Sequence, residues 1–110
     1  MSSITHIVAL KFKPNTTVED KAGLYKAMMR LKDKCVKEDG KPYILSKEGY
    51  DRGMQIVFVV EFASEADLDF YVDHDKAHAE FVHRWALEAV VEEGVVLDFK
   101  EGWDDVDVNE

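Results

Sequence analysis

The chain has 110 residues, 46% of them hydrophobic, and a formal net charge of −9. This length fits a single domain with its own core and leaves no room for a second domain. The acidic balance argues against nucleic acid as a partner, because that affinity comes largely from Lys and Arg side chains that displace counterions. No apolar run approaches the ~18–20 residues that cross a bilayer, and the N-terminus lacks the features of a signal peptide. We therefore expect a soluble, cytoplasmic protein without a membrane partner.

The first predicted element is a strand over residues 5–13, THIVALKFK. Alternation along a strand places two sets of side chains on opposite faces. Pro14 ends this strand, because proline cannot donate a hydrogen bond to a neighbouring strand. One face carries His6, Val8, Leu10 and Phe12, and the other carries Ile7 and Ala9.

A helix is predicted to follow, with Thr17 as its N-cap and two carboxylates, Glu19 and Asp20, in its first turn. Apolar residues recur at helical spacing as far as Leu31, and the stretch KEDGKP ends the helix. Cys35 is the only cysteine, so an intramolecular disulfide is excluded. We expect it to be a semi-buried residue near the helix end rather than a reactive nucleophile.

Two more strands are predicted in the middle of the chain. The first is short and irregular, around residues 43–47, with a turn near Gly53. The second covers residues 55–63, QIVFVVEFA, and has the clearest alternation in the sequence. Ile56, Phe58, Val60 and Phe62 point to one side of it, and Val57 and Val59 to the other.

The second helical region is predicted to have two parts. Ser64 caps a short helix, because SEAD is a variant of the capping box. A longer helix is expected from about Lys76 to Glu92, ended by Gly94, and the stretch VVLDFK then forms the last strand. The inward stripe of the longer helix contains His78, Phe81, Val82, Trp85 and Ala89, while Glu80, Arg84 and Glu88 form an exposed ladder.

The order β-α-β-β-α-β predicts an α+β, ferredoxin-like fold, in which helices cover one face of a four-stranded antiparallel sheet. On whichever face is uncovered, several of Ile7, Ala9, Val57, Val59 and Val96, or their alternates, would meet water. An apolar face of this size is typical of a protein interface. A homodimer with two sheets packed face to face would bury it.

Three segments, THIVALKFKPNTTVEDKAGLYKAMMRL, QIVFVVEFASEADLDFY and HDKAHAEFV, resemble in order and spacing the stress-responsive dimeric α/β-barrel (Dabb) domains. The resemblance covers residues 4–102. We expect a single domain over residues 1–102 and an acidic tail over residues 103–110. The resemblance implies that the sheet of one protomer joins that of a second copy, in agreement with the predicted homodimer.

The Dabb family includes olivetolic acid cyclase, which closes a polyketide by an aldol step without a cofactor. Its acid–base residues correspond by position to His6, Tyr71 and His78 of this sequence. The resemblance therefore implies a cofactor-free site with His78 as the base, Tyr71 as the proton donor, and His6 as an orienting or second acid–base group. The cyclase has two residues where this sequence has three between His74 and His78, a difference that can rotate His78 relative to Tyr71.

The histidines have two other interpretations, a metal site and a structural role in the core. His74 and His78 would share a helix face, but the sequence lacks the glutamate of an HExxH motif, and His83 would lie on the opposite side, so no metal is expected. His74 and His83 are expected to face solvent. An inward histidine is also often a hydrogen-bonded core residue.

The leading hypothesis is thus a small-molecule-pocket protein with polyketide cyclase-like acid–base chemistry and a small apolar or phenolic ligand. The alternative is a non-catalytic stress-responsive homodimer or ligand-binding protein, followed by a cofactor-free monooxygenase. The sequence leaves the substrate open.

Overall fold

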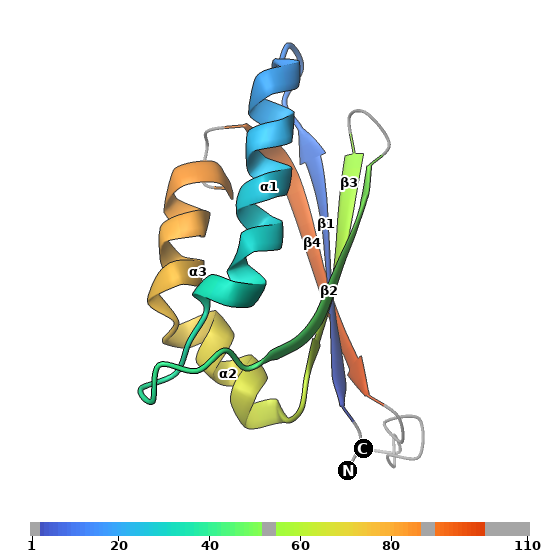
Figure 1. Cartoon of the computed structure of the whole chain (residues 1–110). Helices are drawn as coiled ribbons and strands as arrows, with labels where there is room; N and C mark the ends of the chain where they lie inside the picture. The colour runs from blue at the N-terminus through green and yellow to red at the C-terminus, as the bar shows by residue number, and fades with distance from the viewer. Residues whose placement is uncertain (1–2, 52–54, 87–89, 101–110) are drawn as a thin grey trace, which may run out of the picture.

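The computed structural model describes residues 3–51, 55–86 and 90–100. A four-stranded antiparallel sheet, in the order β2-β3-β1-β4, is covered on one side by helices (Figure 1). This confirms the ferredoxin-like fold predicted from the sequence. The elements are β1 (Ile4–Phe12), α1 (Val18–Lys34), β2 (Ile44–Asp51), β3 (Gln55–Phe62), α2 (Glu65–Asp73), α3 (Lys76–Phe81), the π-helical segment η1 (Val82–Ala86) and β4 (Val91–Lys100).

Helix α1 begins as predicted. The side chain of Thr17 accepts a hydrogen bond of 3.0 Å from the backbone N–H of Asp20, which satisfies one of the donors left free at a helix N-terminus. Cys35 is the C-cap, and its N–H donates to the carbonyl of Leu31. The cysteine side chain is fully buried, more deeply than the semi-buried position expected.

Strand β2 is longer than the sequence predicts, since it runs from Ile44 to Asp51 instead of ending at residue 47. Its second half, KEGYD, has a low intrinsic strand propensity but pairs with β3. Pairing with a neighbour outweighs propensity here. The predicted turn near Gly53 lies outside the described residues.

The predicted long helix from Lys76 to Glu92 is confirmed as far as Ala86 and wrong at its C-terminal end. Helix α3 ends at Phe81, η1 continues to Ala86, and Glu92 already lies in β4, which begins at Val91. Gly94 therefore does not end a helix. It pairs with Leu10 of β1, and a Cβ at this position would lie 3.1 Å from a methyl carbon of that leucine. Ala89 and Glu88, placed on the predicted helix, lie outside the described residues.

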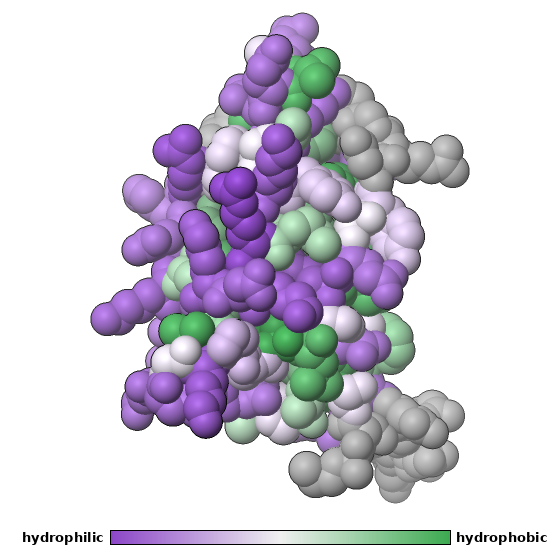
Figure 2. All heavy atoms as spheres, viewed as in Figure 1, coloured by the Kyte–Doolittle hydropathy of each residue, from purple (hydrophilic) through white to green (hydrophobic). Residues whose placement is uncertain are grey.

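The core lies between the sheet and the helices, where the inward faces of β1 and β3 meet α1 and α2. Both strands follow the predicted alternation: the inward residues of β3 are all buried, and those of β1 are buried except for Val8, which is half-buried. Hydrophilic side chains gather over the helices in the view of Figure 2. The largest fully buried side chains include Phe12, Phe58, Phe62, Tyr71, Leu24 and Met28.

The sheet face turned away from the helices is apolar, as predicted, but one of its members was wrongly assigned. Val96 pairs with Val8, so it lies on the helix side, although it is 55% exposed. The alternate residues of β4, Val95, Leu97 and Phe99, lie on the face turned away from the helices. We define the outer face as Ile7, Ala9, Val57, Val59, Val95, Leu97 and Phe99.

Candidate functional site

Four residues, one from each strand, form a row across the helix side of the sheet. His6 of β1 lies opposite Val60 of β3 and, on its other side, opposite Asp98 of β4. Val60 in turn lies opposite Lys47 of β2. His6, Val60 and Lys47 are all buried, so this row places polar groups in the apolar interior.

Helix α2 positions Tyr71 against this row. Its N-cap, Ser64, accepts a hydrogen bond of 3.1 Å from the N–H of Asp67, as the capping box predicts. Tyr71, two turns later, is fully buried, and its ring meets that of His6 edge to face at a centroid distance of 5.7 Å. The phenol therefore lies beside the first-strand histidine.

The break between α2 and α3 brings His78 to the same place. His74 caps the end of α2, and the buried carboxylate of Asp75 caps the start of α3 by accepting a 3.1 Å hydrogen bond from the N–H of His78. The ring centroids of His78 and Tyr71 are 4.1 Å apart. The structure thus brings His6, Tyr71 and His78 together, and the additional residue after His74 does not separate them.

His74 and His83 do not join this cluster. Both are exposed, as predicted. Within the described part of the chain, no group of three or more His, Cys, Asp or Glu residues is arranged to hold a metal ion. Among the same residues, no helix is long and apolar enough to cross a membrane.

Hydrogen bonds satisfy part of the cluster. The Nδ1 of His6 donates to the carboxylate of Asp98, which fixes the orientation of the imidazole. The hydroxyl of Tyr43 donates to Oδ2 of Asp75 at 2.6 Å. The hydroxyl of Tyr71, in contrast, is buried and has no hydrogen-bond partner among the described residues.

Sequence reasoning missed Lys47, Asp75 and Asp98. Lys47 is 7% exposed, and its Nζ lies 5.6 Å from the centroid of the Tyr71 ring. Nothing in SKEGYD indicates that this lysine faces inward, because the direction of its side chain follows from the register with β3. Asp98 was detectable in principle, as a lone carboxylate in the apolar stretch VVLDFK. We define the polar cluster as His6, Lys47, Tyr71, Asp75, His78 and Asp98.

Burial sets the protonation of these groups. Desolvation, followed by the positive charge of Lys47, lowers the pKa of His78 from 6.5 to about 4. Desolvation also raises the pKa of the Tyr71 phenol well above its ordinary value. Near neutral pH the cluster therefore holds an unprotonated imidazole against a neutral phenol, which is a base next to a proton donor.

Cys35 lies at the edge of this region and does not supply a nucleophile. Burial raises the pKa of its thiol to about 12, and the nearby carboxylate of Asp75 acts in the same direction. A thiol in this environment stays protonated, whereas a reactive cysteine needs a stabilised thiolate.

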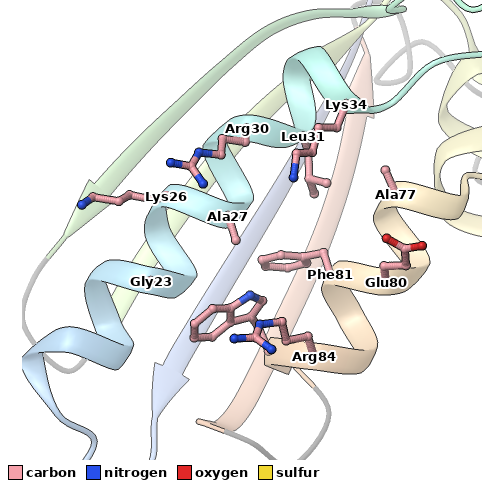
Figure 3. Close-up of a pocket in the computed structure, with 11 residues that line it drawn as sticks. Gly23, Lys26, Ala27, Arg30, Leu31, Lys34, Ala77, Glu80, Phe81 and Arg84 are labelled. Carbon is pink, nitrogen blue, oxygen red and sulfur yellow. The ribbon is translucent and has the colours of Figure 1, made fainter.

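Two of the surface hollows formed by the described residues lie beside the helices of the site. One of about 390 Å³ lies between α1 and α3, where the ring of Phe81 points from α3 toward α1 and Lys26, Arg30 and Arg84 are among the lining residues (Figure 3). Another, of about 960 Å³, is lined by residues of the stretch 34–38, at the end of α1 and just after it, and by residues of α2 and α3. It reaches Asp75 of the polar cluster. His6, Tyr71 and His78 line neither hollow, so neither is the pocket predicted between the sheet and the helices.

A protein-family model described as Stress responsive A/B Barrel Domain (Dabb) matches residues 4–101 of the chain. None of the curated proteins matches it in sequence.

Solved structures share its fold. A Dabb family protein with a ferredoxin-like fold from Mesorhizobium loti is 20% identical, with a TM-score of 0.67 and coverage of 90% of this chain and 96% of the other. A dimeric protein of unknown function from Bacteroides fragilis is also 20% identical, with a TM-score of 0.65 and coverage of 89% and 95%. The hydroxynitrile lyase of Passiflora edulis is 19% identical, with a TM-score of 0.66 and coverage of 89% and 92%. At these identities the likeness establishes the fold alone.

Proposed function

Because the chain belongs to the stress-responsive A/B barrel (Dabb) family, we propose that it is a homodimeric, cofactor-free acid–base enzyme that moves a proton next to a carbonyl group. One observation carries this proposal: Tyr71 and His78 are in ring contact in an apolar interior. Enolisation and aldol chemistry, of the kind used to close polyketide chains, needs a base for the carbon-bound proton and a donor for the carbonyl oxygen.

Each residue of the proposed catalytic set has a role that follows from its surroundings. His78 is the base, because burial keeps its imidazole unprotonated near neutral pH. Tyr71 donates from a hydroxyl that forms no hydrogen bond to the described residues and is therefore free for a substrate oxygen. His6, oriented by Asp98, positions Tyr71 or passes on the proton.

The comparisons support the reaction class only by analogy. The Passiflora protein of the same fold is named a hydroxynitrile lyase. A lyase on this scaffold supports proton-transfer chemistry for this chain as well, although a fold by itself does not define an activity.

The homodimer is the second part of the proposal. Leu97 and Phe99 of the outer face are 58% and 51% exposed, Val95 is also exposed, and Val57 and Val59 are half-buried. A second sheet packed against this face would remove them from water. The Bacteroides protein that shares the fold is described as dimeric.

A non-catalytic, ligand-binding homodimer is the competing function. It is favoured by the closed packing of the cluster, since Tyr71 is completely buried and His6 is 3% exposed. In that case the same polar groups would hold a ligand without turning it over.

Proton exchange tests the proposed function. Purified protein is incubated in D2O with an acetoacetyl thioester, a simple ketone or a cyanohydrin, and the loss of substrate signals is followed by ¹H NMR. We expect faster exchange at the carbon next to the carbonyl of the thioester than in buffer alone. If no compound of this panel is exchanged or cleaved faster than in buffer, the enzyme proposal is rejected in favour of the ligand-binding protein.

A further inference from the structure

Lys47 carries its positive charge in the protein interior, where the loss of hydration costs free energy. Its side chain is buried, and Nζ has no hydrogen-bond partner among the described residues. The residue opposite it on β3 is the fully buried Val60. Buried charges in proteins are normally paired and hydrogen-bonded, because desolvation is otherwise uncompensated. The carboxylate of Asp75 attracts the ammonium but accepts no hydrogen bond from it, so the N–H donors of Lys47 remain unsatisfied.

A second unsatisfied group lies next to it. The Tyr71 hydroxyl is the other buried side-chain polar atom without a hydrogen bond in the described part of the chain, and Nζ of Lys47 lies over the ring of the same tyrosine. The contact with the ring face offsets some of the lost hydration of the ammonium. It leaves the N–H donors of Lys47 and the O–H donor of Tyr71 without acceptors.

The hydrogen-bond donors of Lys47 and Tyr71 have no acceptor among the described residues, and their chemistry indicates which kind of ligand would satisfy them. The ammonium has three donors and no acceptor, and the phenol, which burial keeps protonated, has one donor to offer. The group that satisfies both is an oxygen with negative charge. In a carbonyl compound this is a carboxylate or the enolate oxygen that forms when the α-proton leaves.

We propose that Lys47 is the oxyanion-binding residue of the cluster, and that its ammonium holds the negatively charged oxygen of an enolised carbonyl compound beside the hydroxyl of Tyr71. The inference rests on the proposed function for its substrate class, but it concerns binding and not turnover. The hollow that reaches Asp75 adjoins this cluster from the surface.

The electrostatics of the cluster agree with this assignment. Burial lowers the pKa of Lys47 to about 8, so most of the amine still carries its charge at neutral pH. The same charge is one of the causes that lower the pKa of His78. Lys47 thus adds to the effect of burial in keeping the base unprotonated before the reaction, and it stabilises the oxyanion once the proton has moved.

Acetylacetone is a suitable probe, because it ionises readily to an enolate with its own ultraviolet absorption. With the wild-type protein at neutral pH we expect bound acetylacetone to absorb as the enolate. In Lys47→Met, which keeps the length of the side chain, the enolate should bind about 10- to 100-fold more weakly, the loss expected for one charge-assisted hydrogen bond. Lys32→Met is the matched control, because Lys32 of α1 is exposed, lies outside the polar cluster and lines neither hollow, and it should bind like the wild type.

Thermal unfolding shows whether Lys47 has a structural role instead. Burial outweighs the attraction of Asp75 for the Lys47 ammonium, so replacing this lysine by a methionine of similar size should raise the Tm by about 5 °C. If Lys47 stabilises the folded protein instead, Lys47→Met should lower the Tm.

Three outcomes overturn the inference: no enolate absorption with the wild type, equal binding by the wild type and Lys47→Met, or a covalent adduct on Lys47 seen by mass spectrometry. The last would make the amine a nucleophile and not an oxyanion binder. The proposed function can fail separately. Enolate binding that depends on Lys47, without catalysed exchange of any carbonyl compound, supports the inference and rejects the enzyme.

Discussion

Changing His78 to Gln is expected to slow the exchange of a carbonyl α-proton by about 10²- to 10⁴-fold, the contribution typical of a positioned general base. Glutamine has nearly the same reach but cannot accept a proton to give a stable cation. Its amide can still contact the Tyr71 ring, so the fold should persist. The measurement is the ¹H NMR exchange rate, with circular dichroism and Tm recorded for each variant.

Two further variants complete this experiment. Tyr71→Phe removes only the hydroxyl, which has no hydrogen bond to lose among the described residues. It should therefore slow exchange without lowering the Tm. His83→Gln is the control, because this histidine is exposed, lies outside the cluster and lines neither hollow. If His78→Gln unfolds readily while its exchange rate per folded molecule matches the wild type, His78 is a structural residue and not the base.

Replacing Leu97 by Asp is expected to convert the proposed dimer into a monomer. Leu97 is 58% exposed on the outer face, opposite Ile7 of β1. A carboxylate at this position would be desolvated in a sheet-to-sheet interface, and a buried unpaired charge opposes association by several kcal/mol (roughly 3–5). Light scattering should change from twice 12.6 kDa for the wild type to 12.6 kDa for the variant.

Val18→Asp is the matched control for the dimer. Val18 is 76% exposed, but it lies in the first turn of α1, on the other side of the sheet, where a carboxylate is tolerated by the helix dipole. This variant should keep the mass of the dimer. A wild-type mass of 12.6 kDa at micromolar concentration would contradict the proposed homodimer.

The parts of the fold that the sequence predicted are those governed by local pattern. The alternation of β1 and β3 defined the core faces, and Thr17 and Ser64 marked the helix starts because capping depends on neighbours three residues away. The predicted long helix was wrong only at its C-terminal end, where residues 91–92 lie in β4, and the reason is physical. Its apolar spacing fits a helix, but pairing with β1 makes a strand from Val91 onward, and periodicity contains no information about such a partner.

The residues of the candidate site also fall into two groups, those that local pattern predicts and those that depend on strand pairing. Resemblance and periodicity found His6, Tyr71 and His78, whose inward direction follows from the strand and helix on which they lie. Lys47 and Asp98 join the cluster through the register of β2 and β4, which neither strand encodes alone. The assignment of Val96 to the outer face failed for the same reason, since its side depends on pairing with Val8.

The most direct test of the proposed base is the pH dependence of α-proton exchange by the wild-type protein. His78 accepts a proton only when it is unprotonated, so activity is lost as pH falls through its pKa. With a pKa lowered to about 4, the rate should rise with a midpoint near pH 4 and be level as neutral pH is approached, provided that circular dichroism shows the protein folded throughout. A midpoint near 6.5, the ordinary value for histidine, or the same profile in His78→Gln, would contradict an imidazole desolvated against Tyr71 as the catalytic base.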